Sequence, residues 1–381
     1  MKWATRNSLS LLAWFNHHNP NMVKTLSHYL NCFVLLSAAS SSVTAFLVRQ
    51  GAYNVAKPLR SSESVDETEP VSVIGVVAPL TSVGPYACLG LNFPNIERKP
   101  GFEINFVLDT AANVNTISSE IASELDLPVL IKGEDLSILG SAGAGGSFQA
   151  GDIVLLGDSR LSGMPESQQN NTFMTNMTAA AMNLGIANSV GGGMLGISFF
   201  DCFKGGVEFD WYGTDGDPPT LQFYYDSLPE NAKENASCIA LDTEDFFGVP
   251  TVSVKINGKA LRAIIDTGAP ITIISPAVAD ELGISKKDGT IKIKGIDDGD
   301  AMGVSKSLDE VTLSIGHVNI NLDTIFIGEL PGLAMASNLV PECRQPKVLL
   351  GLDALRRTYR MILRLSKAEL WLEGMTKQDY K

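Results

Sequence analysis

The sequence has few of the residues that build zinc sites or nucleic-acid interfaces. Its 381 residues include 4 histidines and 5 cysteines, and no two cysteines form a C-x-x-C pair. A Cys/His zinc site is therefore not expected, and no metal or organic cofactor is predicted. The formal net charge of -13 provides no basic footprint for phosphate groups, so nucleic acid is not expected as a partner.

Charged residues are also sparse, at 19%, whereas hydrophobic residues make up 45% of the chain and can fill a sizeable core. The 35 glycines and 18 prolines suit a β-rich protein with many turns better than a helical bundle. A chain of this length suggests roughly two domains with additional segments.

The first 70 residues are predicted to lie outside the fold. A basic start at Lys24, an apolar stretch from Cys32 and small residues up to Ala45 follow the order of a secretory signal peptide, which we place at residues 1–45. The apolar centre is shorter than the roughly 20 residues of a membrane span. Contact with a membrane is therefore expected only if this segment stays uncleaved as an anchor.

Residues 46–70 are predicted to form a transit or linker segment. The segment starts with Phe46 and contains basic residues but no acidic residue until Glu63, which resembles a bipartite plastid-targeting presequence. Three N-x-[ST] sequons, at Asn170, Asn176 and Asn235, suit a glycosylated secretory protein instead. We expect the chain to enter the secretory pathway, with a secreted, endomembrane or plastid destination.

An internal repeat organises the rest of the chain. Residues 109–127 align with residues 266–284 without a gap, and 8 of 19 positions are identical. Gly196 follows the first block and Gly351 the second at nearly the same distance, 87 and 85 positions after the leading aspartates. Because the repeat has the length of a lobe rather than of a solenoid unit, it indicates a duplicated domain. We predict an N-terminal lobe over residues 71–230 and a C-terminal lobe over 231–381.

Both halves show the same order of local signals. Each leading aspartate follows a short apolar strand and precedes a short helix, for which Ser118 and Ser275 are suitable N-caps and Pro276 a suitable first residue. Further predicted segments are Gly-rich hairpins over 139–146 and 291–299, strands over 311–315 and 318–326, and closing hairpins over 207–225 and 359–372.

The second half carries I-I-D-T-G-A over residues 264–269 and V-L-L-G over 348–351, and the first half carries a degenerate copy over 107–112 and 194–196. These motifs resemble those of aspartic peptidases, most closely the retropepsin-like families. The resemblance implies an all-β fold of two pseudo-symmetric acid-protease-like lobes, built as closed or semi-open β-barrels with short helices. It also implies a monomer in the pepsin-like, bilobed arrangement, with the active site between the lobes.

The resemblance further implies an aspartic-type endopeptidase acting on peptide or protein substrates. Asp109 and Asp266 would be the catalytic pair, sharing one proton and activating a water molecule. Thr110 and Thr267 would bond to the backbone of the opposite loop, and the Gly-rich hairpins would act as flaps over the substrate. The active-site loops are completed by Ala111, Ala112, Gly268 and Ala269.

Ala111 departs from the family pattern, which has glycine at this position. Its methyl group either fits through a small shift or widens the carboxylate separation, and shifts near 1 Å can lower rates about 10²-fold. Two alternatives therefore stay open: a catalytically silent peptidase-fold protein that binds peptides or partner proteins, and an obligate dimer that uses only Asp266.

Three other features are interpreted as structural. Gly196 and Gly351 are read as packing glycines, because each lies in an apolar run without a reactive group. Asp353 is expected to form a structural ion pair or local backbone bond near Arg356 and Arg357. The acidic residues Asp297, Asp298 and Asp300 are interpreted as a solvated turn.

Overall fold

The computed structural model describes residues 75–136, 141–142, 148–149, 151–184, 191–213, 217–243, 248–287, 290–293, 302–329 and 346–375. All of these residues belong to one compact unit. The predicted signal, transit and linker segments, residues 1–70, lie outside them. No helix among the described residues is long and apolar enough to span a membrane.

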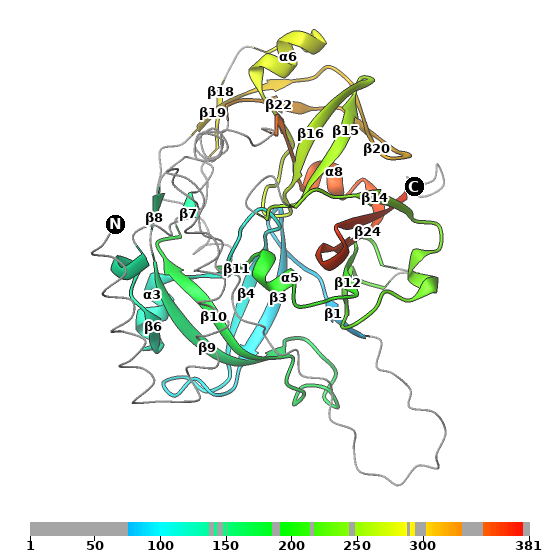
Figure 1. Cartoon of the computed structure of the whole chain (residues 1–381). Coiled ribbons are helices and arrows are strands. Elements are labelled where there is room, and N and C mark those ends of the chain that lie inside the picture. Colours follow the sequence, from blue (N-terminus) through cyan, green and yellow to red (C-terminus); the bar gives the residue numbers. More distant parts are fainter. Residues whose placement is uncertain are drawn as a thin grey trace, which may run out of the picture. The chain divides into compact units, whose positions relative to one another are not determined.

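The first half of the described chain is built around an eight-stranded sheet (Figure 1). Its order is β2 (Thr81–Val83), β3 (Tyr86–Phe93), β4 (Phe102–Leu108), β11 (Gly192–Leu195), β5 (Thr116–Ser118), β10 (Met174–Met182), β9 (Asp152–Leu161) and β6 (Val129–Ile131). Strand β3 also pairs with β9, so the strands from β3 to β9 in this order close into a six-stranded barrel.

The second half contains a nine-stranded sheet. Its order is β18 (Thr290–Ile293), β19 (Met302–Ser307), β22 (Ile325–Ile327), β17 (Ile273–Ile274), β23 (Val348–Leu350), β16 (Lys259–Ile265), β15 (Thr251–Ile256), β20 (Val311–Ile315) and β21 (Val318–Leu322). The order β4-β11-β5-β10-β9 in the first half matches β16-β23-β17-β22-β19 in the second. In both halves the first and third of these pairings are parallel.

One predicted strand in this half is wrong. Residues 318–326 form two strands, β21 and β22, rather than one. The break has a topological reason, because β21 pairs with β20 at the sheet edge whereas β22 pairs with β17 and β19 inside the sheet. The chain must change direction between the two pairings.

A six-stranded sheet joins the two halves. Its order is β1 (Gly75–Pro79), β13 (Thr220–Tyr224), β12 (Gly206–Asp210), β24 (Thr358–Arg364), β25 (Glu369–Gly374) and β14 (Ser237–Ala240). The link is the antiparallel pairing of β12 with β24, with Phe209 opposite Met361. The two predicted closing hairpins are confirmed as the β12–β13 and β24–β25 pairs.

The helices are short, as predicted. They are α3 (Ser119–Glu124), α5 (Ile197–Phe200), α6 (Pro276–Leu282) and α8 (Leu352–Leu355), with 3₁₀ turns η1 (Gly133–Leu136), η2 (Glu230–Lys233) and η3 (Leu365–Lys367). Ser275 caps α6 as predicted, since its hydroxyl accepts from the Val278 amide at 3.4 Å. Ser118 precedes α3 but its hydroxyl makes no cap bond, because it is buried at the end of β5.

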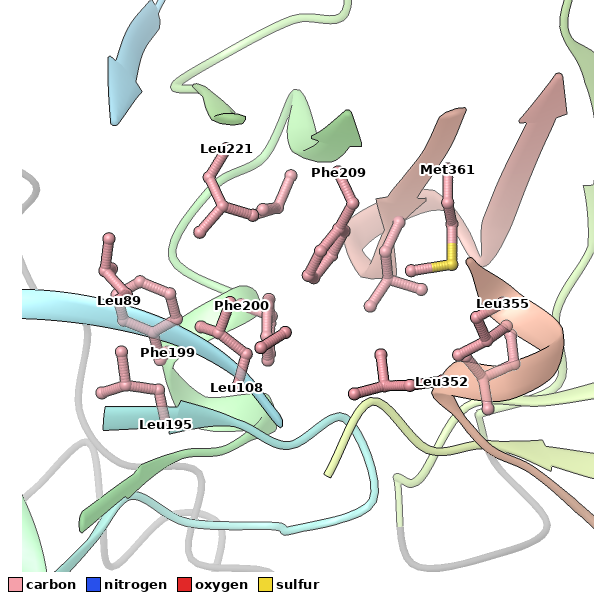
Figure 2. Packing of buried hydrophobic residues seen from close by; sticks show 14 of the residues in the cluster. Leu89, Leu108, Leu195, Phe199, Phe200, Phe209, Leu221, Leu352, Leu355 and Met361 are labelled. Atoms are coloured by element: carbon pink, nitrogen blue, oxygen red, sulfur yellow. The ribbon is translucent and has the colours of Figure 1, made fainter. Parts of the chain in front are cut away.

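The main hydrophobic core continues from one half into the other. Figure 2 shows Phe199, Phe200 and Phe209 of the first half in the same cluster as Leu352 and Met361 of the second. Full burial of each such side chain contributes about 1.5–3 kcal/mol to folding. The all-β, two-lobed prediction with short helices is therefore confirmed, and the core under the leading aspartates is shared by both halves.

Candidate active site

The two leading aspartates occupy equivalent places at the ends of equivalent strands. Asp109 directly follows β4, and its amide donates to the Leu195 carbonyl of β11 at 3.0 Å. Asp266 directly follows β16, and its amide donates to the Leu350 carbonyl of β23 at 3.0 Å. Each aspartate thus lies at the carboxyl end of one strand and is held by a hydrogen bond to the neighbouring parallel strand.

The glycines of the downstream motifs pack against the active-site loops. A Cβ on Gly196 would lie 2.6 Å from the carbonyl oxygen of Ala112. A Cβ on Gly351 would lie 2.3 Å from the carbonyl oxygen of Ile271. Any side chain here would displace loop backbone, so the interpretation as packing glycines is confirmed.

Thr110 and Thr267 tie the two halves together through buried hydrogen bonds. The Thr110 hydroxyl donates to the Ile265 carbonyl at 2.6 Å and accepts from the Thr267 amide at 3.1 Å. Reciprocally, the Thr267 hydroxyl donates to the Leu108 carbonyl at 2.7 Å and accepts from the Thr110 amide at 3.1 Å. These crossed bonds, which the sequence predicted, hold the two aspartate loops in a fixed mutual position.

In each loop, two backbone amides donate hydrogen bonds to one oxygen of the aspartate carboxyl group. Asp109 Oδ1 accepts from the amides of Ala111 at 2.9 Å and Ala112 at 3.0 Å. Asp266 Oδ1 accepts from the amides of Gly268 at 2.9 Å and Ala269 at 3.0 Å. The second oxygen of each carboxyl group therefore stays available for another partner.

The first carboxyl group lies directly against the second loop. A Cβ on Gly268 would be 2.4 Å from Asp109 Cγ and 2.6 Å from Asp109 Oδ2. Such distances are far inside van der Waals contact, so the structure tolerates only glycine at position 268. The contact also places the Asp109 carboxyl group beside the loop that carries Asp266.

The electrostatics of the two carboxyl groups reflect this closeness. Burial raises the pKa of Asp109 above its ordinary value. Burial and then the neighbouring charge of Asp109 raise the pKa of Asp266 well above its ordinary value. Two buried carboxyl groups in contact cannot both ionise easily, so the pair favours retaining one proton.

A further pair of residues supports the loops and was missed by the sequence analysis. Asn115 Oδ1 accepts from the Gly196 amide at 3.1 Å and from the Ser198 hydroxyl at 3.2 Å. In the second half the Thr272 hydroxyl accepts from the Gly351 amide at 3.1 Å. Asn115 and Thr272 are aligned in the repeat, but the two residue types differ, and only their shared offset from the aspartates could have indicated this role.

The predicted ion pair of Asp353 is wrong, whereas the local backbone bond predicted as the alternative is confirmed. Asp353 accepts instead from the Thr272 hydroxyl at 2.6 Å and from the Ala354 amide at 2.8 Å. Arg357, the expected partner, pairs with Asp323 at 3.2 Å. Burial raises the pKa of Asp353. In this buried position its carboxyl oxygens meet hydroxyl and amide donors rather than a guanidinium group.

Hairpins occupy both positions predicted for flaps. β7 (Ser141–Ala142) pairs with β8 (Phe148–Gln149), and β18 pairs with β19. The residues between these strands, 143–147 and 294–301, lie outside the described part of the chain, as do Asp297, Asp298 and Asp300. Within that part, no group of three or more His, Cys, Asp or Glu side chains is arranged to hold a metal ion.

Comparison with known proteins finds that part of the second half is similar to a recognised family. Residues 252–354 match the family model described as "Aspartyl protease". The DNA damage-inducible protein 1 of Chaetomium globosum is 31% identical over 128 residues, which are 32% of this chain and 24% of that protein. The chain thus spans about a quarter of the length of this curated relative.

Two solved structures cover most of the chain at low identity. The aspartic proteinase from Irpex lacteus is 10% identical, with a TM-score of 0.43 over 79% of this chain and 98% of that one. Conglutin gamma, a basic 7S globulin from lupine seeds, is 11% identical, with a TM-score of 0.46 over 81% and 96%. Together with the two aspartate loops, the family match confirms the resemblance to retropepsin-like aspartic peptidases and supports a peptidase in general.

Proposed function

We propose that the protein is an aspartic endopeptidase in which Asp109 and Asp266 jointly activate the water that hydrolyses a peptide bond. The observation that carries the proposal is the placement of the two buried carboxyl groups, with Asp109 directly against the Gly268 loop of Asp266, held by crossed threonine bonds and four amide donors. Because the pKa of each carboxyl group is raised, the pair favours holding one shared proton, which water activation requires.

The proposed reaction needs no other protein group at the reacting atoms. The ionised carboxylate of the pair takes a proton from the water as its oxygen attacks the scissile carbonyl carbon. The protonated carboxyl group donates a hydrogen bond to the carbonyl oxygen and polarises it. When the tetrahedral intermediate collapses, a proton of the pair passes to the leaving nitrogen, which departs as an amine, and the pair again holds one proton.

The geometry around Ala111 favours an active pair over a silent one. The bonds between the two loops are short in both directions, at 2.6 and 3.1 Å for the Thr110 hydroxyl and 2.7 and 3.1 Å for the Thr267 hydroxyl. A methyl group that pushed the first loop away from the second would lengthen these bonds. Their short lengths support a fitted methyl group and a functional pair.

The crossed bonds also favour one chain as the working unit. Thr110 and Thr267 belong to the same chain and satisfy each other's loops, so a second copy has no role in assembling the pair. We therefore propose a monomer with lobes over residues 71–230 and 231–381, an inter-lobe substrate cleft and the two hairpins as flaps. Signal-directed transport into the secretory pathway stays a prediction.

Peptide cleavage by the full-length chain, produced in a eukaryotic secretory host, tests the proposal. A broad peptide library is incubated at pH 4–7 with the wild type, Asp266→Asn and Asp323→Asn, the last replacing an exposed carboxylate that pairs with Arg357. Cleavage by the wild type and by Asp323→Asn, but not by Asp266→Asn, supports the peptidase. A wild type that binds library peptides without cleaving any of them would favour the silent alternative.

A further inference from the structure

Tyr86 is the first residue of β3 and follows a tight hairpin. Gly84 in the turn has a φ of 58°, which favours glycine, and Val83 pairs with Tyr86 across the hairpin. Further along the strand, Cys88 pairs with Val107 of β4 in antiparallel register. Continuing this register by two residues places Tyr86 opposite Asp109, on the same face of the sheet.

The side chain of Tyr86 lies on the sheet face that leads to the aspartates. It is partly buried and packs against a small apolar cluster that is separate from the main core. The buried members of this cluster are Cys88, Val107, Ala180, Met182, Leu184 and Met194. Val107 precedes Asp109 by two residues, so the cluster forms an apolar surface next to the first carboxyl group.

The electrostatics of Tyr86 connect it to the second carboxyl group as well. Burial, and then the charge of Asp266, raise the pKa of the phenol. Cys88 lies beside it in the same cluster, and the charge of Arg356 acts on that thiol. Within the described part of the chain the phenol hydroxyl makes no hydrogen bond, so it is free to meet a ligand.

The equivalent position in the second half is not aromatic. Thr251 pairs with Ile264, and the same two-residue continuation places Val249 opposite Asp266. Val249 is buried, with 5% of its surface exposed. The two sides of the aspartate pair therefore differ, because only the first half presents a partly exposed aromatic ring beside its carboxyl group.

We infer that Tyr86 is a substrate-contacting specificity residue whose ring forms one wall of the pocket for the side chain next to the scissile bond, on the Asp109 side. The inference rests on the proposed function. An aromatic ring on an apolar cluster offers a large apolar contact area at low conformational cost. The pocket should therefore favour large apolar side chains such as leucine or phenylalanine over alanine at that substrate position.

Steady-state kinetics of the full-length chain test this inference. Two peptides that differ only by leucine or alanine next to the scissile bond are compared for the wild type, Tyr86→Phe, Tyr86→Leu and Tyr86→Ala. The preference for leucine, as a ratio of kcat/KM, should fall about tenfold in Tyr86→Ala, since pocket contacts of this size are worth about 10- to 200-fold. Tyr86→Phe should keep the preference, and Tyr86→Leu, which preserves apolar volume and the fold, should lie between them.

Tyr212→Ala, which truncates an exposed tyrosine, should leave the preference unchanged.

The pH profile tests the closeness of the Tyr86 ring to Asp266. Removing the ring hydrates Asp266, which lowers its raised pKa, so the high-pH limb of kcat/KM should move to lower pH in Tyr86→Ala but not in Tyr86→Phe. The titratable groups around the phenol are Asp109, Asp266 and Cys88, with Arg356 acting on Cys88, and all of them stay in place in both variants.

The outcomes of the inference and of the proposed function are distinct. An active wild type whose Tyr86→Ala variant keeps the leucine preference would overturn the inference and leave the peptidase intact. If the wild type cleaves nothing, binding of two statine-type peptides decides, one with the isobutyl side chain of leucine in the statine unit and one with the methyl side chain of alanine there. An equal loss of affinity for both peptides in Tyr86→Ala, or no loss, would overturn the inference, whereas a selective loss for the leucine peptide would uphold it.

Discussion

The loop after β4 and the loop after β16 differ by one methyl group at their centre, Ala111 against Gly268. Both loops hold their carboxyl group with two amide bonds of the same lengths, and both exchange threonine bonds with the opposite half. The Asp109 carboxyl group, however, lies directly against Gly268, with no room for a side chain there. The two loops therefore share a bonding scheme, but a methyl group is present at position 111 and would clash at position 268.

Gly268→Ala should give the largest effect. Its methyl group would meet Asp109 Cγ at 2.4 Å and must displace the first carboxyl group. Because shifts near 1 Å can cost about 10²-fold in rate, kcat is expected to fall about 10²-fold or more. Peptide cleavage and a thermal melt of the same sample check this. A Gly268→Ala protein with wild-type kcat would contradict the restricted space at this position.

Thr110→Val and Thr267→Val should destabilise the protein to similar extents. Each removes a hydroxyl that donates to one buried carbonyl and accepts from one buried amide of the other half. Leaving these groups unpaired should lower the free energy of unfolding by about 2 kcal/mol in each variant. Urea titration measures it, with the exposed Thr312→Val as a control expected within about 0.5 kcal/mol of wild type. A large difference between the two variants would break the equivalence of the loops.

Stability should also depend on pH through the aspartate pair. The pKa of Asp266 is raised in the folded state, so its contribution is fully present below the unfolded-state pKa and is lost as pH rises through the folded-state pKa. We expect the wild-type Tm to fall as pH rises from about 4, the ordinary aspartate pKa, into the neutral range. Asp266→Asn should flatten this fall, because it carries no ionisable group at this site. Parallel melts across this range test the sign, and a wild-type Tm that rises with pH in a way that Asp266→Asn abolishes would contradict it.

Ala111→Gly should give the smallest effect. If the methyl group already fits, its removal should leave kcat within about threefold of wild type and lower the free energy of unfolding by about 0.4–1 kcal/mol through unfolded-state entropy. A gain in kcat of about 10²-fold would instead show that the methyl group holds the pair apart. Together with Gly268→Ala, this variant measures how unequal the two loop centres are.

The sequence predicted those parts of the site that repeat identical residues. Aligning the two blocks located both aspartates, the resemblance to aspartic peptidases predicted the threonine bonds, and the apolar-Gly motifs located the packing glycines Gly196 and Gly351. The alignment could not find Asn115 and Thr272, because different side chains make equivalent bonds there. Tyr86 was missed because its position next to Asp109 follows from strand register, which a sequence pattern does not specify.

The errors in the predicted fold have the same origin. Residues 318–326 look like one alternating strand, but the sheet assigns β21 and β22 to different neighbours. Ser118 has the right residue type for a cap, yet β5 buries its hydroxyl. In both cases tertiary pairing overrides a local preference that the sequence states correctly.

A double-mutant cycle at the two aspartates tests the central claim most directly. The kcat/KM of Asp109→Asn, Asp266→Asn and the double variant is measured on one peptide that the wild type cleaves. Residues that act as one unit are strongly non-additive, so each single variant should already fall to the residual level of the double variant, about 10³-fold or more below wild type. Substantial activity in Asp109→Asn, together with loss in Asp266→Asn, would contradict a shared pair within one chain.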